Sequence, residues 1–258
     1  MSAFETIRIG TDARGIATLT LARSDKHNAM SAEMIAELGQ AAEALGRDEA
    51  VRAVILTGEG RSFCAGADLN WMRAQFDASR SERIDQAMAL ARMLKALNEL
   101  PKPLVGRING QAYGGGLGLI AVCDVAIGVS TAKFAFTETR LGIIPATISP
   151  YVLARMGEGP GRRVFFSAKV FEAAEAVSLR LLSSSVPGEG LDAAVEREIA
   201  PYIDTEPEAV AAAKSLARSL GPIIDEALMA RTAALLADAW EHPGARTRIG
   251  AFLDKAKG

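Results

Sequence analysis

Apolar and polar residues follow two different periods along this chain. Residues 15–21 (GIATLTL) alternate Ala and Leu with Thr, and this period of two predicts a strand with one buried face. Three further runs are mostly apolar and predict buried strands: 51–58 (VRAVILTG), 103–108 (PLVGRI) and 124–129 (DVAIGV).

Two segments between these strands repeat apolar residues every three or four positions, the period of a helix that buries one face. The first follows Ser31, which can cap a helix, and ends at Gly46, whereas the second starts near Ser81. Strands that alternate with helices indicate an α/β fold with crossover connections.

The pattern changes near residue 189, after which one predicted helix follows another. Thr205 and Glu208 bracket a possible capping box at the start of one of these helices. We therefore expect residues 1–195 to form a core that carries the functional site, and residues 196–258 to form a helical region packed against it.

Composition and charge exclude several classes of protein. The 258 residues are 49% hydrophobic and 23% charged, with a net charge of -2, so the chain lacks the positive field that attracts nucleic acid. The N-terminal residues lack the pattern of a signal peptide, and no apolar run approaches the roughly 18 residues of a membrane span. We therefore expect a cytoplasmic protein with no nucleic-acid or membrane partner.

Cysteine and histidine are too sparse to predict a disulfide framework or a metal site. Cys64 and Cys123 lie far apart in apolar surroundings and are expected to be reduced and buried. His27 and His242 have no partner ligands at metal-binding spacing, so no metal is predicted.

Two turns rich in glycine and alanine each follow a predicted strand: RSFCAGADLNW (61–71) and NGQAYGGGLGL (109–119). Small residues leave backbone N–H groups accessible, and two converging N–H donors can stabilise an oxyanion. Removing one such donor from an enzyme costs about 3 to 4 kcal/mol of transition-state stabilisation. One such turn would be explained by close packing of a helix on a strand, but two matching turns favour the oxyanion role.

A dinucleotide-binding interpretation has weaker support. Gly116, Gly118 and Ala121 match G-x-G-x-x-A, and Glu138 lies 20 residues beyond the second glycine. In a dinucleotide fingerprint the glycines form the turn from strand to helix, whereas here they enter a helix after the turn.

Four segments together resemble the crotonase, or enoyl-CoA hydratase/isomerase, superfamily: SFCAGADL (62–69), INGQAYGGGLGLIAVCDVAI (108–127), KFAFTETRLGIIP (133–145) and the C-terminal AFLDKAKG. The resemblance covers essentially the whole chain. It implies a spiral of ββα units and a C-terminal helical region that forms a homotrimer or a dimer of trimers. It also implies an acyl-CoA thioester substrate and no separate cofactor, because coenzyme A is part of the substrate.

The same resemblance assigns roles to backbone groups in the two turns. The N–H groups of Ala67 and Gly115 are expected to hold the thioester oxygen, and the carbonyl of Ala65 to lie near the adenine amino group. Gly114 is expected to line this site. Lys255 resembles the contact that the family makes with the 3'-phosphate of a neighbouring subunit's ligand, although it could equally be a solvated lysine at a helix end.

Other residues near the turns are expected to bind the substrate. Asp68 and Leu69 belong to the first turn, and Trp71 either lines the acyl pocket or packs on the core as part of an amphipathic helix. Tyr113 carries a hydroxyl that could hold water, or it makes a structural hydrogen bond.

Glu138, in TETRLG, matches the second of the two glutamates that flank the double bond in the archetypal hydratases. The first would fall at position 118, which is glycine here. A lone carboxyl group in an apolar pocket should have a raised pKa, which suits general acid/base catalysis near neutral pH. One such group can move one proton, which leaves both hydration and isomerisation open.

The segment IIPATISPYVLARMGE (143–158) resembles the PAxISPYV segment of bacterial 3-methylglutaconyl- and isohexenylglutaconyl-CoA hydratases, which serve leucine and acyclic terpene breakdown. Their substrates bear a second carboxylate, for which Arg73 or Arg140 could supply a cation, although a surface ion pair is the alternative for each. The leading hypothesis is hydration of a branched or carboxylated 2-enoyl-CoA. Isomerisation of a 3-enoyl-CoA, a catalytically weak acyl-CoA-binding protein and, last, a nicotinamide oxidoreductase are the alternatives.

Overall fold

The computed structural model describes residues 4–255, with only the backbone of Lys255. The larger of two sheets has six strands in the order β1-β2-β3-β5-β7-β10. Strands β1 and β2 pair antiparallel, and the remaining neighbours pair parallel. The strands are β1 (Ile7–Thr11), β2 (Ile16–Leu21), β3 (Ala53–Gly58), β5 (Leu104–Ile108), β7 (Val125–Val129) and β10 (Ser184–Val186).

The four strands predicted from the sequence are β2, β3, β5 and β7, which lie side by side in the middle of this sheet. Their predicted bounds differ from the observed ones by one or two residues, because each strand starts one or two residues after its apolar run begins. Their sequences are mostly apolar because helices cover the sheet and most residues of these strands are buried.

A second sheet consists of very short strands, three of which directly follow strands of the larger sheet in the sequence. Its order is β4-β6-β8-β9, with β4, β6 and β8 parallel and β9 antiparallel to β8. The chain passes from β3 to β4, from β5 to β6 and from β7 to β8, and a helix follows each pair. This repetition of ββα units is the expected spiral fold. The strands are β4 (Ser62–Cys64), β6 (Gln111–Tyr113), β8 (Lys133–Ala135) and β9 (Phe171–Glu172).

Helices α1, α2 and α3 of the core begin at residues whose side chains cap them, and α4 and α6 begin after a glycine. Ser31 accepts the N–H of Met34 (3.2 Å), as predicted for α1, whereas α3 begins at Ser79, which forms a capping box with Glu82 slightly before the expected start. These helices are α1 (Ala32–Arg47), α2 (Leu69–Asp77), α3 (Arg80–Asn98), α4 (Gly115–Ala121), α5 (Ser149–Met156), α6 (Glu158–Phe165) and α7 (Ala173–Ser178), with short 3-10 turns η1 (Ser24–Lys26), η2 (Glu138–Leu141) and η3 (Gly188–Gly190).

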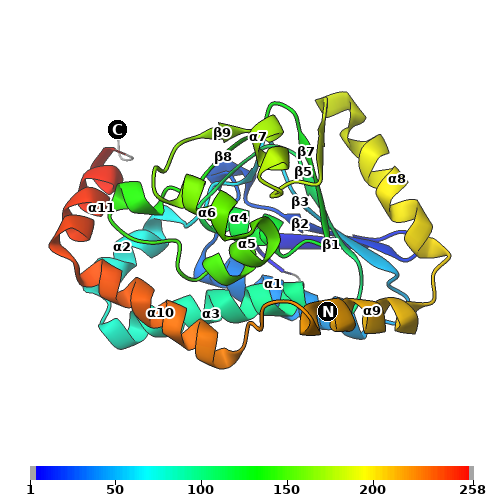
Figure 1. Cartoon of the computed structure of the whole chain (residues 1–258), viewed down its shortest axis with the longest axis horizontal. Helices are drawn as coiled ribbons and strands as arrows, with labels where there is room; N and C mark the ends of the chain where they lie inside the picture. Colours follow the sequence, from blue (N-terminus) through cyan, green and yellow to red (C-terminus); the bar gives the residue numbers. More distant parts are fainter. Residues whose placement is uncertain (1–3, 256–258) are drawn as a thin grey trace.

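Four helices complete the chain, and Figure 1 shows them following one another from α8 to α11 around the sheets. The boundary expected between residues 195 and 196 falls inside α8. The capping box expected at Thr205 and Glu208 is wrong: Glu206 occupies the N-cap of α9, and the Thr205 hydroxyl donates to the carbonyl of Tyr202 (2.8 Å). The helices are α8 (Leu191–Ile203), α9 (Pro207–Ser219), α10 (Glu226–Glu241) and α11 (Pro243–Lys255).

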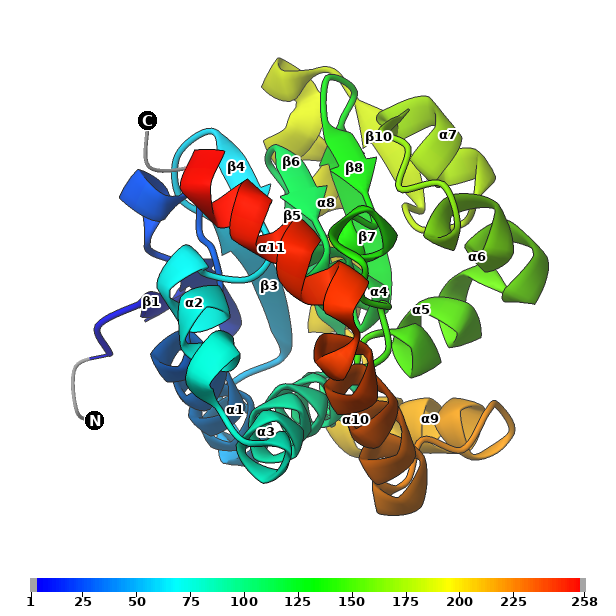
Figure 2. The same cartoon turned by 90° about the vertical axis from the view of Figure 1, so that its left-hand side faces the viewer.

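Helices α10 and α11 pack on the core of the same chain. Helix α10 lies along α3, and α11 contacts α2 and η2 (Figure 2). Trp240 of α10 and Ile249 of α11 are buried in a hydrophobic cluster with Met72 of α2. This packing places the C-terminal helices against the part of the chain that follows β4 and β8.

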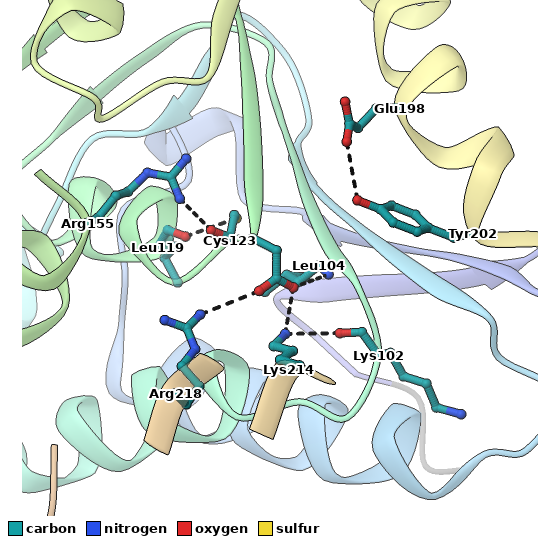
Figure 3. Close-up of polar contacts among 10 residues, drawn as sticks. Lys102, Leu104, Leu119, Cys123, Arg155, Glu198, Tyr202, Lys214 and Arg218 are labelled. Atoms are coloured by element: carbon teal, nitrogen blue, oxygen red, sulfur yellow. Dashed lines mark hydrogen bonds and ion pairs between the residues drawn. The ribbon is translucent and has the colours of Figure 1, made fainter. Parts of the chain in front are cut away.

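Helix α9 is held by one carboxylate at the start of β5 and the start of β7. Asp124 accepts hydrogen bonds from Lys214 (2.6 Å) and from the N–H of Leu104 (2.8 Å), and Arg218 lies 3.5 Å away (Figure 3). Burial lowers the pKa of Lys214. Leu216, on the same helix, remains 60% exposed, so α9 is anchored by ion pairs while part of its apolar surface faces outward.

The two cysteines are free and buried, as expected, and burial raises the pKa of each thiol to about 12. Across the described residues, no helix has both the length and the apolar character needed to cross a membrane.

Candidate active site

Three neighbouring strands of the small sheet each end at one part of the candidate site. The turn that contains Ala67 follows β4, Gly114 and Gly115 follow β6, and Glu138 follows β8. Because β4, β6 and β8 are parallel, their carboxyl ends lie at the same edge of the sheet. Two backbone turns and one carboxyl group, far apart in the sequence, therefore meet at this edge.

The N–H group of Ala67 is directed away from the chain that pairs with it. Met30 forms a parallel bridge with Ala67: its N–H donates to the carbonyl of Gly66 (2.8 Å), and its carbonyl accepts the N–H of Asp68 (3.0 Å). In this pattern the intervening N–H points to the opposite side. It forms no hydrogen bond with any residue that the structure describes, so it is a free donor.

The second turn needs glycine because of its backbone shape and its neighbours. Gly114 has φ +48°, and a Cβ there would stand 3.3 Å from Oε1 of Glu138. Gly115 is the first residue of α4, where a backbone N–H has no intrahelical partner. Within residues 4–255 this N–H has no partner outside the helix either. The glycines thus bring a second free donor close to the carboxyl group of Glu138.

A cavity of about 600 Å³ contains both donors and Glu138. Leu69 and Trp71 of α2 form one part of its lining, and Leu236, Trp240 and Phe252 from α10 and α11 form another. The C-terminal helices therefore complete a predominantly apolar chamber. The lining also includes Ala65, whose carbonyl is expected near the adenine, and the polar residues of the segment 25–27.

Glu138 is half-buried as a residue, but its Oε2 atom is buried and has no hydrogen-bond partner among the described residues. Burial raises the pKa of Glu138 to about 7, because the ionised form loses its hydration, while a bond from its own backbone N–H lowers the pKa slightly. The raised pKa expected from the sequence is thus found. At neutral pH the group can both accept and donate a proton.

Position 118, where the archetype has its first glutamate, lies beneath another side chain. A Cβ on Gly118 would stand 2.7 Å from Cγ2 of Ile148 and 3.1 Å from its Cβ. Ile148 is buried at the start of α5 and lines the cavity. A side chain at position 118 would therefore meet Ile148, which packs directly against the glycine.

The same packing argues against dinucleotide binding. Gly116 and Gly118 lie within α4, and a Cβ on Gly116 would stand 2.7 Å from the carbonyl oxygen of Cys64. These glycines allow α4 to pack closely on β4 and α5, which accounts for the partial match to the fingerprint.

Asp68 lines the cavity, but its carboxylate already has structural partners. It caps α2 by accepting the N–H groups of Asn70 (2.8 Å) and Trp71 (3.3 Å), and it pairs with Arg23 at 2.9 Å. Burial acts to raise its pKa, but these hydrogen bonds outweigh burial and hold the pKa below the usual value. Asp68 thus shapes the turn, and its contact with substrate stays a prediction.

Tyr113 is not among the cavity-lining residues. Its hydroxyl donates to Oε1 of Gln111 (3.4 Å), two residues away on the same face of β6. Strand geometry directs both side chains to that face. This bond is the structural alternative expected for the hydroxyl, and the water-holding role stays a prediction. Trp71, by contrast, lines the cavity. Its indole N–H donates to Oε1 of Gln86 (3.1 Å), and this bond fixes the indole ring in the cavity wall.

The two candidate cations differ in position. Arg140 donates to the carbonyl of Ala168 (2.9 Å) and is not among the residues that line the cavity, so the structure gives no support to it as the cation for a substrate carboxylate. Arg73 lines the cavity, and its Nε is buried without a partner among the described residues, while its Nη atoms contact Asn70 (3.2 Å) and the carbonyl of Leu253 (3.4 Å). The side chain of Lys255 lies outside the described residues.

Sequence reasoning missed Ile148 and Thr147. The latter is 3% exposed, lines the cavity, and has an unpartnered hydroxyl oxygen within the described structure. The only signal was the unusual composition of the segment 143–158, because the contact of Ile148 with α4 joins residues 30 positions apart.

Comparison with known proteins agrees with this fold. Residues 11–257 match the family model described as Enoyl-CoA hydratase/isomerase, and the chain belongs to this family. A putative enoyl-CoA hydratase of Thermus thermophilus is 33% identical over 180 residues, which cover 69% of this chain and 71% of that protein.

Solved structures of the family have the same fold over nearly the whole chain. An enoyl-CoA hydratase from Shewanella pealeana is 35% identical with a TM-score of 0.82, covering 98% of this chain and 94% of that one. Pseudomonas aeruginosa AtuE is 33% identical with a TM-score of 0.80, covering 97% of each chain.

Proposed function

We propose that the protein adds water to a 2-enoyl-CoA thioester. The observation that carries the proposal is the meeting of Glu138, with a pKa near 7, and two free backbone N–H donors in one apolar cavity. Family membership supplies the acyl-CoA class of substrate. We further propose that no separate cofactor or metal takes part, because a proton carrier and two oxyanion donors suffice for this reaction.

In the proposed reaction, ionised Glu138 takes one proton from water while the water oxygen bonds to C3 of the acyl chain. The electron pair of the C2–C3 double bond moves toward the thioester oxygen, where the N–H groups of Ala67 and Gly115 stabilise the enolate. Glu138 then returns its proton to C2. One hydroxyl and one hydrogen are added, and the carboxylate is regenerated.

A branched or carboxylated acyl chain is the proposed substrate. The support is Arg73, which lines the cavity and whose buried Nε has no partner within the described structure. A guanidinium group can bind a carboxylate. Measuring kcat/KM for 3-methylglutaconyl-CoA and crotonyl-CoA with the wild type and Arg73→Met tests this. Loss of the preference for the carboxylated substrate is expected, and an unchanged ratio would reject the role of Arg73.

Isomerisation of a 3-enoyl-CoA is the second candidate. It is favoured by the absence of a carboxylate at position 118, where Ile148 packs against the glycine. One carboxyl group can remove a proton from C2 and return it to C4. Parallel assays with 2-enoyl- and 3-enoyl-CoA esters separate the two activities, and isomerisation without detectable hydration would overturn the leading proposal.

A catalytically weak acyl-CoA-binding protein is tested by Glu138→Gln. If the variant binds CoA esters and turns over at the wild-type rate, neither proposed use of Glu138 stands. A fall in turnover with retained binding is the result expected of an enzyme.

We also propose that the chain forms a cytoplasmic homotrimer or a dimer of trimers, with Lys255 reaching the 3'-phosphate of a neighbour's ligand. Exposed apolar side chains near α9 support association, with Leu220 80% and Ile223 74% exposed. Light scattering after size-exclusion chromatography measures the mass, and a monomer at micromolar concentration would reject the assembly.

A further inference from the structure

Two residues that line the cavity each have a buried side-chain oxygen without a hydrogen-bond partner among the described residues: Oε2 of Glu138 and Oγ1 of Thr147. The first is accounted for by the proposed proton transfer. The second is not, although Thr147 is only 3% exposed. Buried hydroxyl groups in proteins nearly always have a partner, so an unpartnered one in a substrate cavity points to a ligand that supplies it.

A structural role would explain Thr147 if its hydroxyl capped α5 or closed the preceding turn. It does neither. The N-cap of α5 is Ile148, and no side chain caps this helix. The turn is closed by other groups: the N–H of Ser149 donates to the carbonyls of Pro145 (3.1 Å) and Ala146 (3.2 Å), and its hydroxyl donates to the carbonyl of Ala146 (2.7 Å). The hydroxyl of Thr147 therefore has no hydrogen bond within the described structure, although the N–H and hydroxyl groups of Ser149, two residues later, both have partners.

The position of Thr147 relates it to the missing carboxylate. Its neighbour Ile148 covers Gly118, so the segment that excludes a side chain at 118 also brings a hydroxyl to the cavity wall one residue earlier. We propose that Thr147 is a water-positioning residue, whose hydroxyl holds the attacking water together with Glu138.

This inference rests on the proposed hydratase function and deepens it. The Thr147 hydroxyl accepts a hydrogen bond from the water O–H that does not react, while Glu138 accepts the proton that is transferred. Two fixed partners orient the water lone pair toward C3. A hydroxyl stays protonated at neutral pH, so Thr147 keeps its own proton and transfers none, and the balance of the reaction is unchanged.

The test separates water positioning from the rest of the chemistry. Thr147→Val removes the hydroxyl with little change of shape, and Thr147→Ser retains it. Ser149→Ala is the matched control, because it removes a hydroxyl from the same segment outside the cavity lining. Two reactions are measured: hydration of crotonyl-CoA, and exchange of the C2 protons of butyryl-CoA in D₂O, followed by mass spectrometry. Exchange uses Glu138 and the two N–H donors but needs no water held at C3.

We expect Thr147→Val to lower kcat for hydration by about 10- to 100-fold, the effect of one lost hydrogen bond in a transition state, with exchange unchanged within about twofold. Thr147→Ser should recover most of the hydration rate, and Ser149→Ala should leave both reactions near wild type. Wild-type hydration by Thr147→Val, or equal loss of both reactions, would overturn the inference alone. Exchange by the wild-type protein without hydration of either crotonyl-CoA or 3-methylglutaconyl-CoA would overturn the hydratase proposal and this inference together.

Discussion

Replacing Glu138 by Gln should stabilise the protein at alkaline pH more than at acidic pH. The carboxyl group is buried in the cavity, and its pKa is raised from 4.5 to about 7. A carboxyl group with a raised pKa in the folded state disfavours folding wherever it must ionise. Glutamine has nearly the same shape and never ionises, so it removes this cost.

The magnitude follows from the shift of about 2.5 pH units, which at about 1.4 kcal/mol per unit corresponds to about 3 kcal/mol. Below about pH 4.5 the group is protonated in both the folded and the unfolded chain, and the cost is absent. Between about pH 4.5 and 7 the unfolded chain ionises first, so the wild type loses stability as pH rises. Above about pH 7 both states are ionised, and the full cost remains.

Urea denaturation at pH 4.5 and pH 8.5 gives the free energy of unfolding of both proteins. The advantage of Glu138→Gln over the wild type should increase by about 3 kcal/mol between these two pH values. Glu33→Gln, at an exposed position on α1, is the matched control and should show no comparable increase. An advantage of Glu138→Gln that is the same at both pH values would refute the argument that burial raises this pKa.

Three further substitutions test the site. Glu138→Gln should lower kcat by about 10²- to 10⁴-fold with a small change in KM, as steady-state kinetics will show, because the only proton carrier is lost; a mainly increased KM would indicate a binding role. Gly118→Ala should lower the free energy of unfolding in urea by about 1 to 3 kcal/mol, because its Cβ would meet Ile148 at 2.7 Å; unchanged stability would mean that Ile148 moves aside easily. Gly66→Ala should lower kcat by about 10²-fold, because φ is +93° and the new Cβ would lie 2.9 Å from the carbonyl of Tyr113, displacing the donor of Ala67; wild-type kcat would show that this donor is not needed.

Long, buried elements of the fold could be predicted from the sequence, and short ones could not. The central strands β2, β3, β5 and β7 are five or six residues long and mostly apolar, so their pattern is visible without the structure. Strands β4, β6, β8 and β9 have only two or three residues, too few to show a period. Their pairing depends on where the larger sheet directs the chain.

The candidate site shows the same division. Ala67, Gly115 and Glu138 were predicted because each belongs to a local sequence motif, and the structure brings them to one cavity. Thr147 and Ile148 were missed because their importance comes from the packing of α5 on α4. The bond between Tyr113 and Gln111 could not be assigned from the sequence, because β6 is too short to show which side chains share a face.

The contact between Gly118 and Ile148 restricts how this enzyme can evolve. Gly118→Glu alone would introduce a side chain into space already filled by Ile148, so it would lower stability before it could contribute to catalysis. Ile148→Gly alone would leave a cavity in the wall of the pocket. Each single step toward a second carboxylate is thus unfavourable, and selection would have to fix both changes together. A lineage that has acquired this pair of residues is therefore expected to keep its single glutamate and to diversify through the residues around it.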